Sequence, residues 1–437
     1  MRNKIFITII FIVAILLRLY PIITKPLWLD EIYSLYFASN FSALQILFRL
    51  PDCHPGLFYL ILKGLMSISL NPIFLRLFVS AIPELIGCII IQKVFKKPIL
   101  TAIFLLNPFF IHSAYQIRMY GLVSLLSIII FSQVYLKKIS VPKILILIFI
   151  ANLISYSFII PSICLLFYLA FTKQKKWLFI IPLILIEFFI FKGPQYKTFA
   201  ESSSWIATPT LNNIPSVVLS SLALNTDINS RNFYPFFWSI IFYLIFSIFV
   251  FYQSKKHLLF LFTFTLPLLF TILISIIFPF LSQHNFFYIF IPKISLFLPR
   301  FLIPISIAFY IFLYKFYPSP FLILILLPFW IKTYSSINLH SFYPSQSPLF
   351  VQNQLILPPW ENFRLNPNFS NTDLEKMSQN YHHALSIEKS ILNFDNDPNC
   401  QLIQSNFPIT YVNQTLKSLE SYQQYFQKTI KYCSYRN

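Results

Sequence analysis

Glycine and acidic residues are scarce in this chain. Its 437 residues include 5 glycines and 14 aspartates and glutamates. So few glycines exclude the Gly-rich phosphate loops of nucleotide-binding folds and a GxxxG helix-dimer face. The 5 cysteines show neither a CxxC pair nor the Cys/His spacing of a zinc site. The chain also shows no internal repeat, although repeats are common in transporters.

What the chain has in abundance is apolar sequence. Hydrophobic residues make up 57% of it, charged residues 11%, and the mean hydropathy is +0.68, which indicates a polytopic membrane protein. Residues 335–437 hold 7 Lys/Arg and 7 Asp/Glu, which leaves 26 of the 33 bases and 7 of the 14 acids to residues 1–334. Most of these bases form short clusters between apolar runs. The net charge of +19 therefore indicates orientation in a membrane, and we predict no binding of nucleic acid.

The apolar stretches predict about eleven transmembrane helices. They cover residues 5–23, 73–92, 99–111, 122–136, 144–160, 162–171, 177–191, 236–252, 258–280, 301–314 and 321–331. The lysine clusters at 93–97, 137–143, 173–176 and 255–256 fall on one side only if segment 57–70 does not cross. We therefore place residues 30–70 in an outer loop with two interfacial helices, one after Glu31 and one after Pro55. The protein is then a multi-pass protein of the cell membrane, with a cytoplasmic N-terminus and an extracytoplasmic C-terminus.

The composition changes near residue 333 to Ser, Asn, Gln and Tyr with scattered charges. This change predicts two domains, an all-α transmembrane domain over residues 1–334 and a small extracytoplasmic domain of undefined class over residues 335–437. Cys400 and Cys433 lie in the second domain and can form a disulfide if it lies outside the cytoplasm.

Asp30 and Glu31 form an acidic pair just after the first apolar run. Two adjacent carboxylates at a lipid boundary suit proton abstraction, or cation binding, where a lipid-borne substrate meets a water-borne one. If a divalent metal ion takes part, these two side chains are its ligands; no other cofactor is predicted. The alternative is that they only end the first helix in water, with Glu31 stabilising the next helix through its dipole.

Three basic residues belong to the same predicted outer side. Pro55 suits the first position of a helix, which makes His54 the N-cap and directs backbone N–H groups at a lipid phosphate. Arg118 precedes the fourth crossing and Arg300 the tenth, and an arginine there either snorkels or holds a phosphate through two hydrogen bonds.

Other ionisable residues lie inside the apolar runs themselves. Arg18, Glu84 and Glu187 are of this kind. Intramembrane charges need partners, and we interpret these three as structural pairs within the helix bundle.

Four short motifs, taken in order, carry a family resemblance. They are residues 18–20 (Arg-Leu-Tyr), 27–34 (Leu-Trp-Leu-Asp-Glu-Ile-Tyr-Ser), 54–59 (His-Pro-Gly-Leu-Phe-Tyr) and 118–122 (Arg-Met-Tyr-Gly-Leu). Together they resemble the bacterial membrane glycosyltransferases related to protein O-mannosyltransferases and to the aminoarabinose transferases that modify lipid A. Residues 299–301 (Pro-Arg-Phe) are similar to that family's later arginine motif. Relatives usually carry a second proline where this chain has Gly56.

The resemblance implies a GT-C fold and a polyprenyl-phosphate sugar donor, with transfer on the extracytoplasmic face to a hydroxyl of a protein, lipid or glycan. The residues that it implies are Asp30 as general base with Glu31 beside it, the donor-phosphate ligands Arg118, Arg300 and His54, and the substrate-binding tyrosines Tyr33, Tyr59 and Tyr120. The alternatives are a transporter or flippase of lipid-linked sugars, in which these charges only bind, and an inactive scaffold for envelope assembly.

Overall fold

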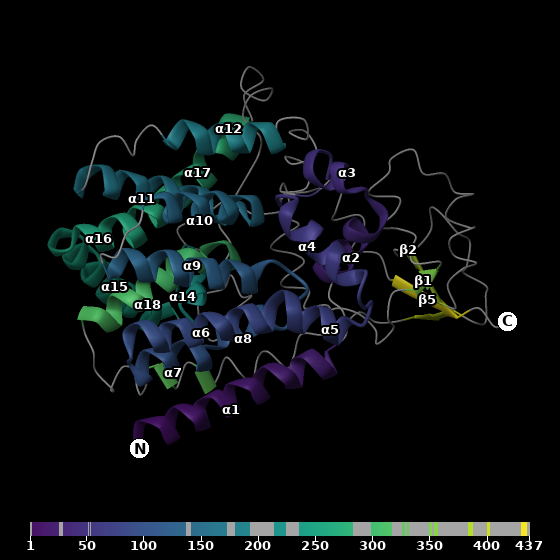
Figure 1. The fold of residues 1–437 in the computed structure, drawn as a ribbon, viewed down its shortest axis with the longest axis horizontal. Helices are drawn as coiled ribbons and strands as arrows, with labels where there is room; N and C mark the ends of the chain where they lie inside the picture. Colours follow the sequence, from purple (N-terminus) through teal and green to yellow (C-terminus); the bar gives the residue numbers. More distant parts are fainter. Residues whose placement is uncertain are drawn as a thin grey trace. The chain divides into compact units, whose positions relative to one another are not determined.

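The computed structural model describes residues 2–25, 29–50, 52, 54–136, 141–172, 180–192, 214–223, 236–282, 299–316, 326–327, 330–331, 349–351, 354–356, 383–387, 400–402 and 430–434. The chain forms two units (Figure 1). The helical unit comprises Met1–Lys25 and Ser42–Ser341, and the second unit comprises Pro26–Phe41 and Phe342–Asn437. Asp30 and Glu31 thus belong to the same unit as the C-terminal residues. The predicted domains, 1–334 and 335–437, remain a prediction.

The described part of the helical unit consists of helices. Its elements are α1 (Arg2–Thr24), α3 (Ala43–Phe48), α4 (Leu57–Met66), α5 (Pro72–Arg76), η1 (Leu77–Ala81), α6 (Ile82–Phe95), α7 (Pro98–Leu106), α8 (Pro108–Ala114), α9 (Tyr120–Tyr135), α10 (Val141–Ile154), η2 (Tyr156–Phe158), α11 (Ile159–Thr172), α12 (Ile180–Lys192), α14 (Ile214–Ser221), α15 (Phe236–Lys256), α16 (Leu258–Phe260), η5 (Leu261–Thr265), α17 (Leu266–Ser282), η6 (Pro299–Leu302) and α18 (Ile303–Phe316). Of these, η1 and η5 are π-helical, and η2 and η6 are 3₁₀ turns.

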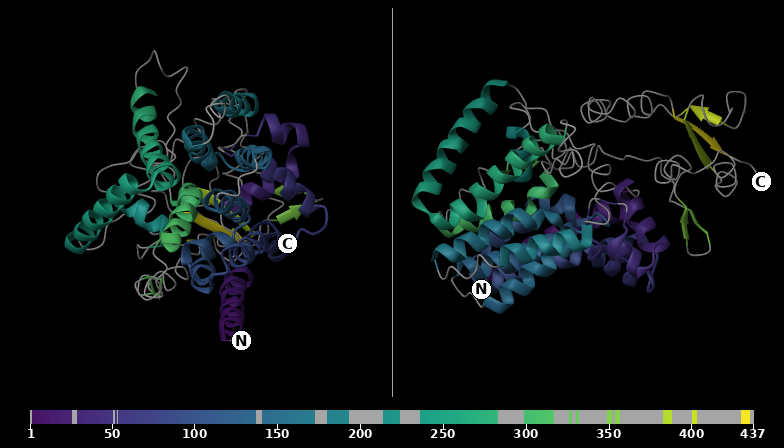
Figure 2. Two further views of the ribbon diagram at one scale, coloured as in Figure 1. Left: turned by 60° about the vertical axis from the view of Figure 1, so that its left-hand side comes forward. Right: turned by 90° about the horizontal axis from the view of Figure 1, so that it is seen from above.

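Three described helical stretches are long and apolar enough to cross a bilayer. They are Ile5–Thr24, Pro72–Phe95 and Leu258–Ile277. Figures 1 and 2 show α1 at the periphery of the helical unit, and its side chains Ile5, Ile12 and Leu16 are exposed. An exposed apolar face of this kind is the part of a helix that lipid covers. The chain is therefore an all-α membrane protein in its helical unit.

Two predicted crossings are interrupted where short polar side chains cap a new helix. The predicted segment 99–111 divides into α7 and α8, because Asn107 has extended backbone and its side chain accepts the Phe109 N–H at 2.9 Å. The predicted boundary at Pro161 was wrong. The break lies at Ser155, whose hydroxyl accepts the Ser157 N–H at 3.3 Å, and Pro161 is tolerated in the first turn of α11. Most of the predicted segment 321–331 lies outside the described residues.

Two buried arginines attach α1 to its neighbours. Arg18 donates to the Leu105 carbonyl at 2.8 Å and forms an ion pair with Glu84. Arg76 donates to the Ile22 carbonyl at 3.0 Å, at the end of α1. The prediction that Arg18 and Glu84 are structural partners is confirmed, and the side chain of Glu187 lies outside the described residues.

The helices α9 and α18 pack side by side, and their C-terminal ends meet, so that they run in the same direction. Tyr135, the last residue of α9, donates to the Ala308 carbonyl at 3.2 Å, and its main-chain carbonyl accepts from Lys315 at the end of α18. Because the two helices end together, they also begin together. The residues that precede α9 and α18, Arg118 and Arg300, therefore lie at the same end of this helix pair.

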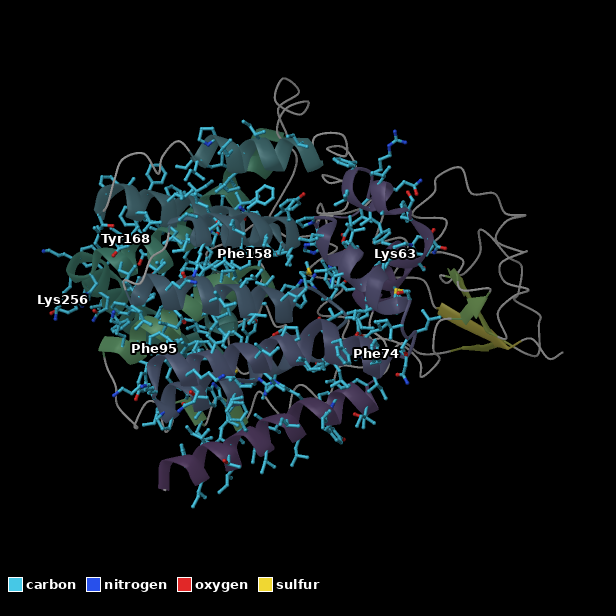
Figure 3. All side chains as sticks on the ribbon, viewed as in Figure 1. Lys63, Phe74, Phe95, Phe158, Tyr168 and Lys256 are labelled. Atoms are coloured by element: carbon cyan, nitrogen blue, oxygen red, sulfur yellow. The ribbon has the colours of Figure 1, made fainter. Side chains whose placement is uncertain are left out.

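The predicted cytoplasmic and outer segments lie at opposite ends of the helical unit. Figure 3 shows Phe95 and Lys256 toward one end, and Lys63 and Phe74 toward the other. Phe95 and Lys256 close helices whose loops are predicted to be cytoplasmic, whereas Lys63 belongs to the predicted outer loop. The arrangement agrees with the predicted orientation, and the orientation in the membrane remains a prediction.

The second unit combines one helix with short strands. Helix α2 (Leu29–Asn40) is accompanied by the antiparallel pair β1 (Leu349–Val351) and β2 (Gln354–Ile356) and by a sheet of order β3-β5-β4, formed by β3 (His383–Ile387), β5 (Ile430–Ser434) and β4 (Cys400–Leu402). Strand β2 lies near α2. In the antiparallel register of β4 and β5, Cys400 is the partner of Cys433.

Candidate phosphate-binding site

The predicted site residues are distributed over both units. Helix α2 of the second unit carries Asp30, Glu31 and Tyr33. The helical unit carries the predicted phosphate ligands and two of the predicted substrate-binding tyrosines, namely His54, Arg118, Arg300, Tyr59 and Tyr120.

Arg118 lies in the short bend between α8 and α9, and its backbone is fixed by the π-helical turn η1. The Ser80 hydroxyl is 2.5 Å from the Gln116 carbonyl and 2.9 Å from the Arg118 carbonyl, so that its single hydrogen is shared between them. Gly121 then passes so close to Ser80 that an added Cβ would lie 2.2 Å from the Ser80 carbonyl oxygen. A π-turn is a frequent feature of functional sites, and here it contacts the arginine bend directly.

The Arg118 side chain is buried and joined to the predicted outer loop. Its Nη1 donates to the Tyr59 hydroxyl at 3.3 Å, and this hydroxyl donates to Asp52 Oδ2. Tyr59 lies in the first turn of α4 and is fully buried, whereas Asp52 is half-buried. Two residues that are 59 positions apart in the sequence are thus brought into one hydrogen-bond chain.

His54 connects the same loop to the Arg300 turn. Its ring lies 5.6 Å from the ring of Phe301, the residue after Arg300 in η6. The predicted N-cap was wrong, because α4 begins at Leu57 and its N-cap is Gly56, whose carbonyl accepts the Leu60 N–H at 3.1 Å. The buried His54 side chain packs in the interior instead of capping the helix.

Glycine is required at position 56 for a steric reason. A Cβ at this position would lie 2.4 Å from the Ile46 carbonyl oxygen, at the end of helix α3. Its φ of −74° is ordinary, so the close approach of the two backbones is what requires glycine. A proline at this position would place its Cβ in the same space.

Taken together, these contacts gather basic groups at one end of the helical unit. Arg118 is tied to α4 through Tyr59, and His54, just before α4, contacts the turn that contains Arg300. A guanidinium group can donate two parallel hydrogen bonds to two oxygens of one phosphate, and an imidazole adds a further N–H donor. Such a set can hold a phosphate group and stabilise negative charge that develops on it.

The remaining predicted tyrosines differ in their surroundings. Tyr120 is buried at the first position of α9, two residues after Arg118. Tyr33 is half-buried and its ring stacks on Phe37 at 6.0 Å. Burial raises the pKa of the neighbouring Tyr36 above its ordinary value.

The carboxylates Asp30 and Glu31 lie in the first turn of α2. Glu31 is buried, and the Asp30 carbonyl accepts the Ser34 hydroxyl at 2.8 Å. Acidic residues in a first turn stabilise a helix through its dipole, so both the catalytic hypothesis and its structural alternative stand. Within the described ranges, no cluster of three His, Cys, Asp or Glu side chains has the geometry of a metal site.

Three features of the site escaped the sequence reasoning. Asp52, Ser80 and His112 are not among the site residues that the sequence predicts. His112 Nδ1 is 2.6 Å from the Tyr115 hydroxyl, and its Nε2 is 3.1 Å from the Gln116 amide, so this imidazole braces the arginine bend from the α8 side. The spacing His-x-x-Tyr-Gln, three and four residues along one helical turn, is the signal that could have identified the cluster.

Comparison of the chain with protein-family models, with curated proteins and with solved structures found no match. The likeness to membrane glycosyltransferases therefore rests on the sequence motifs alone.

Proposed function

We propose that this protein is a membrane glycosyltransferase with a GT-C fold. It transfers a sugar from a polyprenyl-phosphate donor to an acceptor hydroxyl on the extracytoplasmic face of the cell membrane. The observation that supports this best is the convergence of Arg118, His54 and the Arg300 turn at one end of the helical unit. The sequence motifs support the same class of reaction.

In the proposed reaction the acceptor oxygen attacks the anomeric carbon of the sugar. Asp30 takes the hydroxyl proton as the new C–O bond forms. The bond between the anomeric carbon and the phosphate oxygen breaks, and its electron pair leaves with the lipid phosphate. Because the attack is in line with the leaving group, the configuration at the anomeric carbon inverts. Glu31 orients Asp30, binds the sugar or ligates a metal ion.

The leaving phosphate gains charge as the bond breaks, and the basic residues meet this need. Arg118 and Arg300 supply planar guanidinium groups, and His54 supplies a ring N–H. The predicted topology, about eleven crossings with the lysine-rich loops inside, would put these groups on the outer side. That is the side on which an acceptor outside the cytoplasm is reached.

The test is sugar transfer by purified protein in detergent, with a panel of polyprenyl-phosphate sugars as donors and release of the sugar as the signal. We expect transfer, or slow donor hydrolysis where the acceptor is missing. Asp30→Asn keeps the shape of the side chain but cannot take the proton, so turnover should fall by about 10²-fold or more with little change in donor binding. Donor binding with no turnover for any sugar would favour a flippase, and no binding would favour a scaffold.

A second comparison separates phosphate binding from snorkelling. Arg118→Lys keeps the charge but loses the planar fork, so donor turnover should fall by about 10- to 100-fold. The matched control is Arg49→Lys, because Arg49 is exposed at the end of α3 in the same loop region. Equal activity of the two variants would remove Arg118 from the phosphate site.

A further inference from the structure

We propose that Asp52 and Tyr59 are positioning residues for Arg118, and that Tyr59 acts through this arginine instead of touching the substrate. The inference rests on the proposed function for its consequence in catalysis. The geometry on which it is built is independent of that function. It also assigns Asp52 a role that the sequence motifs do not give it.

The direction of the hydrogen-bond chain is determined by chemistry. A guanidinium only donates, an ionised carboxylate only accepts, and a tyrosine hydroxyl does each once along such a chain. Arg118 Nη1 therefore donates to the Tyr59 oxygen at 3.3 Å, and the Tyr59 hydrogen goes to Asp52 Oδ2. With its hydrogen given to Asp52, the Tyr59 hydroxyl cannot at the same time donate to a sugar.

Burial supports the same assignment. Tyr59 is 0% exposed, so its hydroxyl is enclosed by protein. Its neighbour Phe58 is also fully buried and packs edge-on against it, with ring centroids 5.0 Å apart. The ring is therefore held in place from the α4 side. Its hydroxyl accepts the Arg118 N–H and can so fix the plane of the guanidinium.

The chain of bonds also has an electrostatic effect. The Asp52 carboxylate polarises the Tyr59 hydroxyl, which strengthens the oxygen as an acceptor for Arg118. The backbone of Arg118 is fixed separately by the Ser80 hydroxyl, at 2.9 Å from its carbonyl. Backbone and side chain are thus held by different elements. A bidentate contact to a phosphate requires such control of orientation.

The first experiment measures the arginine directly, without any ligand. Purified protein in detergent is treated with phenylglyoxal, and modification of the peptide that contains Arg118 is followed by mass spectrometry. We expect Tyr59→Phe and Asp52→Ala to speed this modification by about fivefold or more, because both break the chain. The modification rate in Asp52→Asn should lie between the rates of these two variants and the wild-type rate, since the amide oxygen of asparagine still accepts a hydrogen bond.

The matched control is Tyr310→Phe. Tyr310 is equally buried, and its hydroxyl donates to the Leu222 main-chain carbonyl, outside the Arg118–Tyr59–Asp52 hydrogen-bond chain. Its loss should leave the modification rate of Arg118 unchanged. Equal rates for Tyr59→Phe and the wild type would overturn the proposal, and so would equal acceleration by Tyr59→Phe and Tyr310→Phe.

The second experiment is a double-mutant cycle with undecaprenyl monophosphate as the probe. Tyr59→Phe should weaken its binding by about tenfold in the wild-type background, and Arg118→Ala should weaken it further. In the Arg118→Ala background, Tyr59→Phe should have no additional effect. A second tenfold loss there would mean that Tyr59 contacts the lipid itself, which overturns the inference and leaves the proposed function intact. If Arg118→Ala binds the probe as the wild type does while the modification rates change as expected, the proposed phosphate role of Arg118 fails and the positioning geometry stands.

Discussion

The buried ion pair between Arg18 and Glu84 gives the sharpest test of how the helical unit is held together. Both side chains are almost fully buried, at 1% and 2% exposure. Arg18 also donates to the carbonyls of Leu105 at 2.8 Å and Ala14 at 3.1 Å, so one guanidinium joins α1, α6 and α7. Removing Glu84 leaves this cation in an apolar bundle without the opposite charge.

The expected magnitudes follow from the partners that each variant leaves behind. Glu84→Ala should lower the free energy of unfolding by about 3–5 kcal/mol, the usual cost of an uncompensated buried charge. Glu84→Gln keeps an acceptor and loses only the charge, so about 1.5–3 kcal/mol is expected. The double variant Arg18→Met/Glu84→Leu should lose only about 1 kcal/mol, for the Leu105 carbonyl that no longer has its donor.

The assay is thermal unfolding in detergent micelles followed by tryptophan fluorescence, with sugar transfer measured on the same samples. A double variant that is more stable than either single variant, and still active, is the expected result. If Glu84→Gln unfolds like the wild type, the pair does not stabilise the bundle. If the double variant is stable but inactive, the pair has a role in chemistry and the structural interpretation is wrong.

Three further predictions concern other parts of the chain. Gly121→Ala should destabilise the protein by about 1–3 kcal/mol and weaken binding of undecaprenyl monophosphate, because the added Cβ would lie 2.2 Å from the Ser80 main-chain oxygen in the π-helical turn. The control is Gly64→Ala, which should have neither effect in the same assays, because an added Cβ there has no neighbour within 4 Å. Cys400 and Cys433 are partners in an antiparallel register, which suits a cross-strand disulfide, so a non-reducing gel of protein from an oxidising compartment should show a mobility shift that Cys400→Ser removes. Burial, and to a smaller extent the adjacent Lys256, lower the pKa of His257 below 6.5, so the folded state binds fewer protons than the unfolded chain just below that pH. The stability of the fold should therefore fall as the pH drops from about 6.5 toward the lowered pKa. In a series of melting curves at different pH, His257→Gln should show a smaller change in melting temperature than the wild type.

The sequence determined those properties that depend on local composition. Long apolar runs predicted helices because a chain in lipid must satisfy its backbone hydrogen bonds internally, and the structure confirms helices over 5–24, 72–95 and 258–277. The polar interruptions at Asn107 and Ser155 were readable in principle, since both are capping residues before a new helix. The partnership of Arg18 and Glu84 followed from the cost of an unpaired charge inside a bundle.

Only the tertiary structure decided which side chains meet at the candidate site. Arg118 contacts Tyr59 and Ser80 across 59 and 38 positions of sequence, and His54 contacts Phe301. These contacts depend on how each helix is rotated about its axis and on how closely two backbones approach at Gly121 and Gly56. Neither quantity is contained in an apolar pattern that is nearly uniform around a buried helix. The sequence could therefore name the arginine, but only packing determined what holds it.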